Sequence, residues 1–137
     1  MAGITTPQTA TGVATGTNTE TVALTIPFSG GNSMNDSLAN PISGNNCKTR
    51  ISGSVNITAG TGTTAIVIRC RKNGLTGTVV GVSHTDTLAA GNTEDIPYYF
   101  DDTAPGYAQA YVITVQQTGG TAAGTVNFVE GSTQDYN

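Results

Sequence analysis

The side chain best suited to acid–base chemistry in this sequence is its single histidine, His84. Asp86 follows two residues later, and residues two apart in a strand project from the same face. Such a pair could form a catalytic dyad, in which the carboxylate orients the imidazole. However, no catalytic motif of serine, cysteine or carboxylate surrounds it, and the GxSxG, HExxH, phosphate-loop and dinucleotide motifs are absent. We therefore interpret His84 as an exposed strand-edge histidine and predict no catalytic residue and no enzymatic activity.

Four acidic residues bracket one expected strand: Glu94, Asp95, Asp101 and Asp102. Loops rich in oxygen ligands can hold Ca²⁺. The spacing Asp-x-Asp-x-Asp is absent, and adjacent acids in a strand point in opposite directions. These residues are therefore interpreted as solvated loop acids, and the sequence predicts neither a metal site nor a cofactor.

Two cysteines, Cys47 and Cys70, are too few for a disulfide framework. We interpret them as two buried free thiols, because free cysteine behaves as a small hydrophobic residue. A disulfide between them stays open at this point.

The composition favours a structural or binding protein. The chain has 137 residues, enough for one domain with a real core, and only 10% of them are charged, whereas roughly 25% is usual. Thr, Ser, Asn, Gln and Gly must therefore cover the surface, as in secreted β proteins and viral structural proteins. The net charge of −4 and the lack of a basic arm argue against nucleic acid as a partner.

The sequence also argues against a membrane protein. No apolar run approaches the ~20 residues that a membrane-spanning helix needs. The first residues lack the basic and apolar regions of a signal peptide. We expect a soluble chain made in the cytoplasm.

Alternating apolar residues between turn signals predict about eight strands and no helix. Such a pattern is typical of a sandwich, jelly roll or small barrel, and we favour an antiparallel β-sandwich of jelly-roll type. Asn73-Gly74 is the strongest turn signal, because both residues tolerate positive φ. The expected strands are residues 20–28, 48–58, 64–71, 76–82, a short segment around Leu88, 95–100, 107–117 and 125–129.

Residues 1–18 have little apolar pattern, and residues 19–137 form the expected single sandwich domain. We interpret the first segment as an extended N-terminal arm that becomes ordered on a neighbouring subunit. The arm residues proposed to make that contact are Ile4, Thr5, Thr6 and Pro7.

All five basic residues fall in one short stretch: Lys48, Arg50, Arg69, Arg71 and Lys72. If residues 48–58 and 64–71 form a hairpin, these side chains lie close together. They would then form a basic patch that binds an acidic partner surface. The alternative is an ordinary solvated face on which the same residues pair with acids, and the sequence does not choose between the two.

From about Thr49 to Val129 the sequence resembles small jelly-roll proteins of tailed phages, namely capsid decoration (cement) proteins and fibre-head domains of tumour-necrosis-factor and C1q shape. The resemblance rests on residues 64–69, the turn Lys72-Asn73-Gly74, and the segment 98–106 leading into Tyr111-Val112-Ile113-Thr114-Val115. It implies a homotrimer without catalytic residues.

We therefore expect a capsid decoration protein on the virion surface, bound to capsid subunits and to like subunits. One alternative is a minor or major capsid jelly-roll protein. Another is a carbohydrate- or receptor-binding module such as a tail-fibre head, for which exposed tyrosines would bind glycan. Tyr98 and Tyr99 face opposite ways in a strand, so one of the two is expected in the core.

Overall fold

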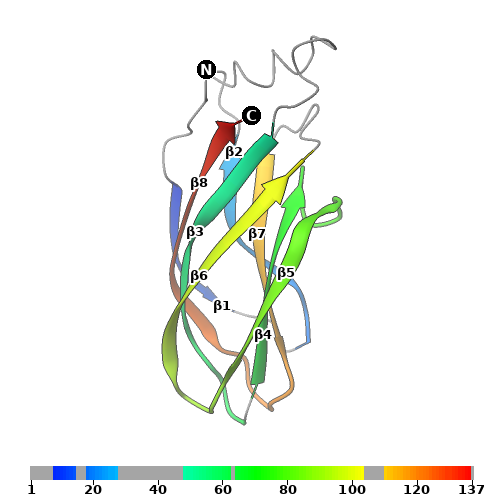
Figure 1. The fold of residues 1–137 in the computed structure, drawn as a ribbon. Coiled ribbons are helices and arrows are strands. Elements are labelled where there is room, and N and C mark those ends of the chain that lie inside the picture. Colours follow the sequence, from blue (N-terminus) through cyan, green and yellow to red (C-terminus); the bar gives the residue numbers. More distant parts are fainter. Residues whose placement is uncertain (1–7, 15–17, 28–47, 63, 104–109, 137) are drawn as a thin grey trace.

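The computed structural model describes residues 8–14, 18–27, 48–62, 64–103 and 110–136 (Figure 1). Eight strands contain most of these residues, and none of the described residues form a helix, so no membrane-spanning helix occurs among them. In chain order the strands are β1 (Gln8–Ala14), β2 (Thr21–Pro27), β3 (Lys48–Thr58), β4 (Thr64–Lys72), β5 (Val79–Leu88), β6 (Thr93–Asp102), β7 (Ala110–Thr118) and β8 (Thr125–Tyr136).

The strands form two antiparallel sheets of four, which pack face to face (Figure 1). The first sheet has the order β1-β8-β3-β6 and the second the order β2-β7-β4-β5. Hydrogen bonds join four strand pairs, namely β1·β8, β2·β7, β3·β6 and β4·β5. These are the pairs of one long antiparallel hairpin whose strands are distributed over two sheets. This is the strand order of a jelly roll, and the predicted fold class is confirmed.

The core lies between the sheets and follows the predicted alternation. Ile51, Val55 and Ile57 of β3 are fully buried, as are the inward residues of β4 and β7. Each such side chain contributes about 1.5–3 kcal/mol through burial. Tyr98 is 5% exposed and Tyr99 is 68% exposed, so the expectation that one of them is in the core is confirmed.

Residues 48–58 and 64–71 do not form the hairpin considered for them, because β3 and β4 belong to different sheets. Both strands have one apolar face, and those faces meet across the core. The connection from β3 to β4 crosses from the first sheet to the second, and backbone hydrogen bonds join it to the neighbouring turn between β5 and β6. The Ala59 amide donates to the Asn92 carbonyl at 2.9 Å, and Gly91 donates to Gly60 at 3.1 Å. Alternation alone does not distinguish such a corner from a hairpin within one sheet.

The Asn73-Gly74 turn is confirmed, with φ of +66° and +131° at these residues. It joins β4 to β5, where the structure has one continuous strand instead of the two short segments expected. β5 is the end strand of its sheet, and its middle, residues 83–87, is polar. A strand at the edge needs no apolar alternation along its whole length. This explains why the sequence pattern predicted two separate segments instead of one strand.

The expected N-terminal arm requires a correction within its described part. Gln8–Ala14 form β1, which pairs with β8 in the first sheet and so belongs to the sandwich. Backbone hydrogen bonds hold this strand, since Thr9, Thr11 and Gly12 are exposed and Ala10 is only partly buried. An apolar pattern therefore could not reveal it. The arm residues Ile4, Thr5, Thr6 and Pro7 lie outside the described residues.

Cys70 is a free thiol in the core and is fully buried. Burial raises its pKa well above the ordinary thiol value, so the thiol stays protonated at neutral pH. The interpretation of Cys70 as a buried thiol is confirmed, and Cys47 lies outside the described residues.

Candidate functional site

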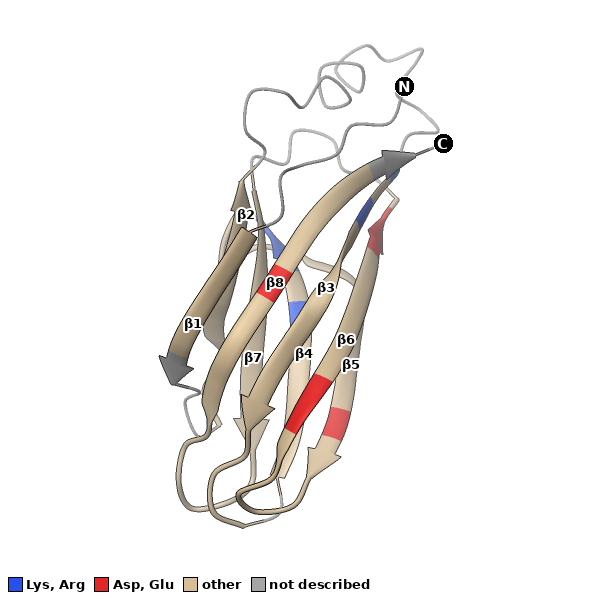
Figure 2. Ribbon diagram, turned by 90° about the vertical axis from the view of Figure 1, so that its left-hand side faces the viewer, with Lys and Arg blue, Asp and Glu red and all other residues tan. Residues whose placement is uncertain are grey.

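The structure divides the basic residues between the two sheets (Figure 2). Arg50 lies on β3 in the first sheet, whereas Arg69, Arg71 and Lys72 lie on β4 in the second. These four residues all form ion pairs with acids. The ion pairs agree with the alternative of a face on which the basic residues pair with acids. A contact of Lys48 and these four residues with a partner stays a prediction.

Arg50 is held on the outer face of the first sheet by a bidentate ion pair. Its Nε and Nη2 atoms donate to the two carboxylate oxygens of Asp101 at 2.7 and 2.8 Å. The guanidinium also lies over the Tyr99 ring, 5.2 Å from the ring centroid. The pairing follows from the register, since Arg50 lies opposite Asp101 in the β3–β6 ladder. Arg50 thus fixes both a carboxylate and an exposed aromatic ring.

Glu20, just before β2, is the centre of a second charged group. Its carboxylate accepts hydrogen bonds from Arg71 Nε and Nη2 at 2.7 and 2.8 Å, and Arg69 Nη1 lies 3.8 Å away. Thr114 of β7 also donates to it. The Arg71 hydrogen bonds hold the pKa of Glu20 below its ordinary value. These partners are 51 and 94 residues away in the chain, so no local sequence signal could have revealed the group.

We expect Glu20→Gln to lower the free energy of unfolding at pH 7 by about 1–2 kcal/mol, because it removes a charge that faces two arginines. The folded pKa of Glu20 is depressed, so its contribution is present above its unfolded pKa and is lost as the pH falls through the folded value. The difference between wild type and Glu20→Gln should therefore shrink below about pH 4.5. Urea unfolding at pH 7 and pH 3 measures it.

Glu94→Gln serves as the control, since Glu94 is exposed on β6. It should change stability at pH 7 by no more than about 0.5 kcal/mol. An equal loss in both variants would show that net charge, and not the arginine contacts, explains the effect of Glu20→Gln.

The interpretation of the four acids as loop residues is wrong, because Glu94, Asp95, Asp101 and Asp102 all lie within β6, near its two ends. Their environments differ. Asp101 faces Arg50 on the outside, whereas Asp102 is 6% exposed and contacts Lys72 Nζ and the Tyr111 hydroxyl, each at 2.8 Å. The expectation that adjacent acids point in different directions is confirmed for this pair. Among the described residues, no group of three or more His, Cys, Asp or Glu side chains could hold a metal ion.

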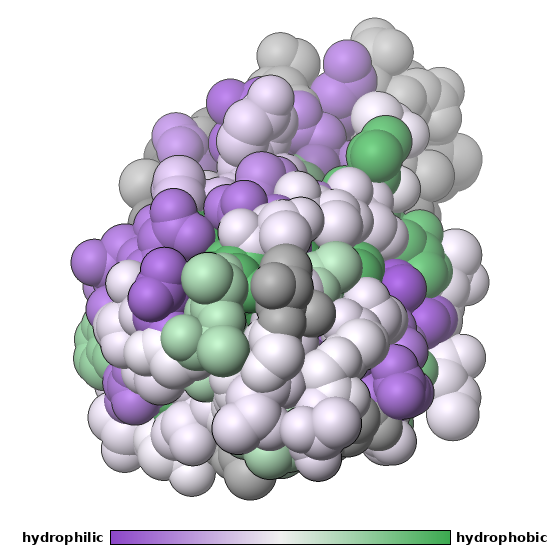
Figure 3. Space-filling view, turned by 90° about the horizontal axis from the view of Figure 1, so that it is seen from below, coloured by the Kyte–Doolittle hydropathy of each residue, from purple (hydrophilic) through white to green (hydrophobic). Residues whose placement is uncertain are grey.

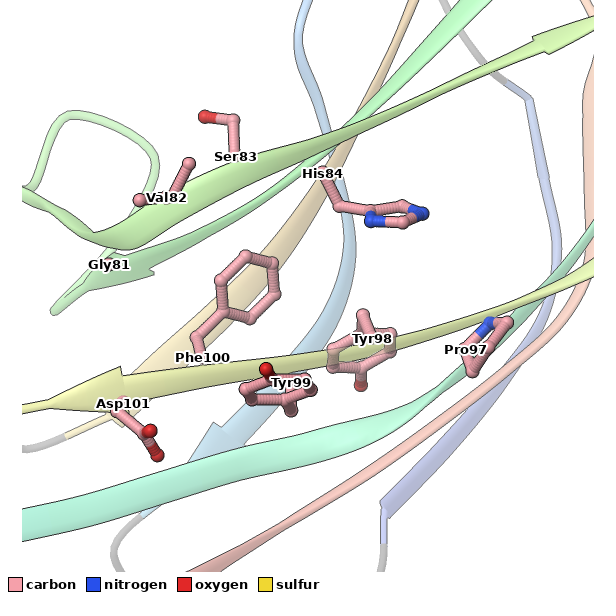
Figure 4. A pocket seen from close by; sticks show the side chains of 9 residues that line it. All are labelled: Gly81, Val82, Ser83, His84, Pro97, Tyr98, Tyr99, Phe100 and Asp101. Carbon is pink, nitrogen blue, oxygen red and sulfur yellow. The ribbon is translucent and has the colours of Figure 1, made fainter.

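A hollow of about 650 Å³ opens between β5 and β6, where the edges of the two sheets meet (Figure 4). We call it the β5–β6 hollow, and its lining residues are Gly81–His84 and Pro97–Asp101. Figure 4 shows His84 and Phe100 projecting into the space between the two strands. His84 is exposed on an end strand, as expected from the sequence. Val82 and Tyr99 are 86% and 68% exposed, so two large apolar side chains lie at this opening.

Three turns follow the C-terminal ends of β3, β5 and β7. These turns contact one another and contain no charged residue. We call this the turn end, and it consists of residues 59–62, 89–92 and 118–124. The Thr61 and Thr121 hydroxyls are 2.7 Å apart, and the Gln117 side chain donates to the Ala122 carbonyl at 2.7 Å. Seen from this end, most of the surface has intermediate hydropathy, with small hydrophilic and hydrophobic groups between (Figure 3). The turn end is therefore uncharged and internally braced.

Comparison with known proteins gives information on the fold alone. No protein-family model matches the sequence, and no curated protein matches it significantly. A chain in the structure of infectious bursal disease virus, strain Gx, superimposes with a TM-score of 0.56 over 96% of this chain, at 10% identity. A chain of the T13 particle of the same virus gives 0.50 over 94%, also at 10% identity.

This chain spans about a third of those chains, namely 32% and 30% of their length. A chain from the disulfide-linked pili of Bacillus endospore appendages superimposes with a TM-score of 0.45 at 15% identity, over 98% of this chain and 88% of that one. A TM-score below 0.5 does not establish a common fold. The sandwich is thus similar in fold to part of a protein found in a viral particle.

Proposed function

We propose that this chain is a structural protein of a viral particle, and that it acts as a decoration protein bound to the outside of a capsid. The observation that carries the proposal is the jelly-roll strand order of this chain, together with its similarity in fold to chains of a virus particle at TM-scores of 0.56 and 0.50. The low charge of the chain agrees with the proposal. A subunit with few charged side chains has few charges to desolvate when it buries a large surface against its neighbours.

The turn end is the surface that best fits attachment to a capsid. It contains no charged side chain, so its burial leaves no charge unpaired. Its hydrogen bonds brace the turns before any contact forms, which lowers the entropy cost of binding. The homotrimer stays part of the proposal, and light scattering would give a mass of about three times 13.9 kDa if it forms.

The test uses the virus that carries the gene. Purified particles should contain the protein, and particles made without it should still assemble but lose thermal stability, which the added protein restores. Failure of any shell to assemble without the gene would instead support the alternative of a capsid jelly-roll protein. Purified particles that lack the protein would overturn the proposal.

Two matched variants locate the attachment surface. Ala90→Arg places a charge on the exposed turn end and should weaken attachment to particles by at least about tenfold. Thr11→Arg places the same charge on the exposed part of β1 and should leave attachment unchanged. Equal attachment of both variants would exclude the turn end.

A further inference from the structure

We propose that the β5–β6 hollow binds a neutral saccharide of one or two rings, with Tyr99 as the aromatic surface on which the sugar stacks. This activity is separate from attachment to a capsid and would give the particle a means of binding a glycan receptor. It can therefore be tested on the isolated chain.

The shape of the hollow limits the size of the ligand. At one end β5 and β6 are joined by the turn at residues 89–92. At the other end the two strands approach closely, since a Cβ on Gly81 would lie 3.6 Å from the Asp101 amide nitrogen and 3.9 Å from the Phe100 Cα. Gly81 has a φ of +65°, a conformation that favours glycine, where the pairing of β5 with β4 shifts register. The lining residues span only 81–84 of β5 and 97–101 of β6, and a hollow of this length fits a compact ligand.

Tyr99 is held in place before any ligand binds. Tyr99 is 68% exposed, and the Arg50 guanidinium lies over its ring, 5.2 Å from the ring centroid. The bidentate pair with Asp101 fixes Arg50 in turn. A ring immobilised in this way loses little entropy on binding, and its apolar surface can cover the C–H face of a sugar. Val82 of β5 also lines the hollow, but its side chain points away from β6 and is 86% exposed (Figure 4).

The polar groups fit hydroxyls and disfavour anions. Ser83, His84 and Asp101 line the hollow, and the His84 imidazole, which projects into the space between the strands, can exchange hydrogen bonds with hydroxyl groups (Figure 4). Arg50 neutralises Asp101, so neither charge is left over to bind a charged ligand. The other acids on these two strands, Asp86, Glu94 and Asp95, would repel an anionic ligand.

Saturation-transfer NMR on the purified chain tests the proposal, with glucose, galactose, N-acetylglucosamine and lactose as probes. At least one of them should receive magnetisation at its ring C–H protons. Glucuronate is the anionic match of glucose and should bind more weakly. Tyr99→Thr, which keeps a residue suited to a strand, should lower the affinity of the best probe by about tenfold.

Phe128→Ala is the matched control, because Phe128 is a partly exposed aromatic residue on β8, outside the hollow. It should leave saccharide binding unchanged, and the melting temperature of Tyr99→Thr should show that the fold is intact. The proposal is overturned if no neutral saccharide receives magnetisation, if Tyr99→Thr binds as tightly as wild type, or if glucuronate binds as tightly as glucose. None of these results depends on whether the chain attaches to a capsid.

Discussion

Replacing Gly53 by alanine should lower the free energy of unfolding by about 3 kcal/mol or more. Gly53 faces the core from the centre of β3, directly opposite Gly131 on one side and Tyr98 on the other. A Cβ at this position would overlap the backbone carbonyl of Glu130 and come within 2.7 Å of the Tyr98 hydroxyl. That hydroxyl donates to the same Glu130 carbonyl at 2.6 Å. The change would therefore force two strands apart and strain a partly buried hydrogen bond. Urea unfolding measures the loss.

Gly131→Ala gives the sharper comparison, because its Cβ would meet side chains instead of another strand's backbone. The nearest atoms are the Tyr98 hydroxyl, Ile26 Cδ1 at 2.8 Å and Leu24 Cδ2 at 3.2 Å. Removing the hydroxyl with Tyr98→Phe should recover part of the stability lost in Gly131→Ala and little of that lost in Gly53→Ala.

Ser54→Ala, at the neighbouring position, is the control. The Ser54 hydroxyl makes an exposed hydrogen bond to the Glu130 carboxylate at 3.4 Å. Its loss should change the free energy of unfolding by no more than about 0.5 kcal/mol. If Tyr98→Phe rescued both glycine variants equally, the backbone overlap at Gly53 would not be the cause of its loss.

Local alternation was sufficient to predict the fold class and the inward faces. Ile51 and Ile66 lie in different sheets, yet both point into the core, as their positions in alternating runs predicted. The same pattern could not assign strands to sheets, because a strand that crosses to the other layer buries the same face as one that turns back in its own layer. The hairpin considered for residues 48–58 and 64–71 is absent for this reason, since β3 and β4 lie in different sheets.

Edge strands were the other limit of the sequence. β1 contributes backbone hydrogen bonds and little buried surface, and the middle of β5 is polar, so both lack the signal that marks a central strand. The β5–β6 hollow depends on β5 as one continuous edge, so its location could not be predicted. What the sequence did contain was Tyr98-Tyr99, whose opposite orientations require one exposed ring.

Asp102→Ala should lower the free energy of unfolding by about 3 kcal/mol, because it removes a buried carboxylate that two other groups contact. Asp102 is 6% exposed, and Lys72 Nζ and the Tyr111 hydroxyl each lie 2.8 Å from its Oδ2 atom. Tyr111 is fully buried, and burial raises its pKa, so the phenol stays a hydrogen-bond donor over the working pH range. Lys72 keeps 22% of its side chain exposed and can turn toward water, which limits the cost.

Asp102→Asn separates the two contacts, because an amide still accepts a hydrogen bond from Tyr111 but carries no charge for Lys72. We expect it to lose less stability than Asp102→Ala, with thermal or urea unfolding as the measurement. A double-mutant cycle of Asp102→Ala with Tyr111→Phe should give a coupling energy above about 0.5 kcal/mol. Equal losses for alanine and asparagine, with no coupling to Tyr111, would mean that the ion pair alone stabilises this end of β6. The network joins β4, β6 and β7, which belong to both sheets, so its loss should loosen the contact between the two layers.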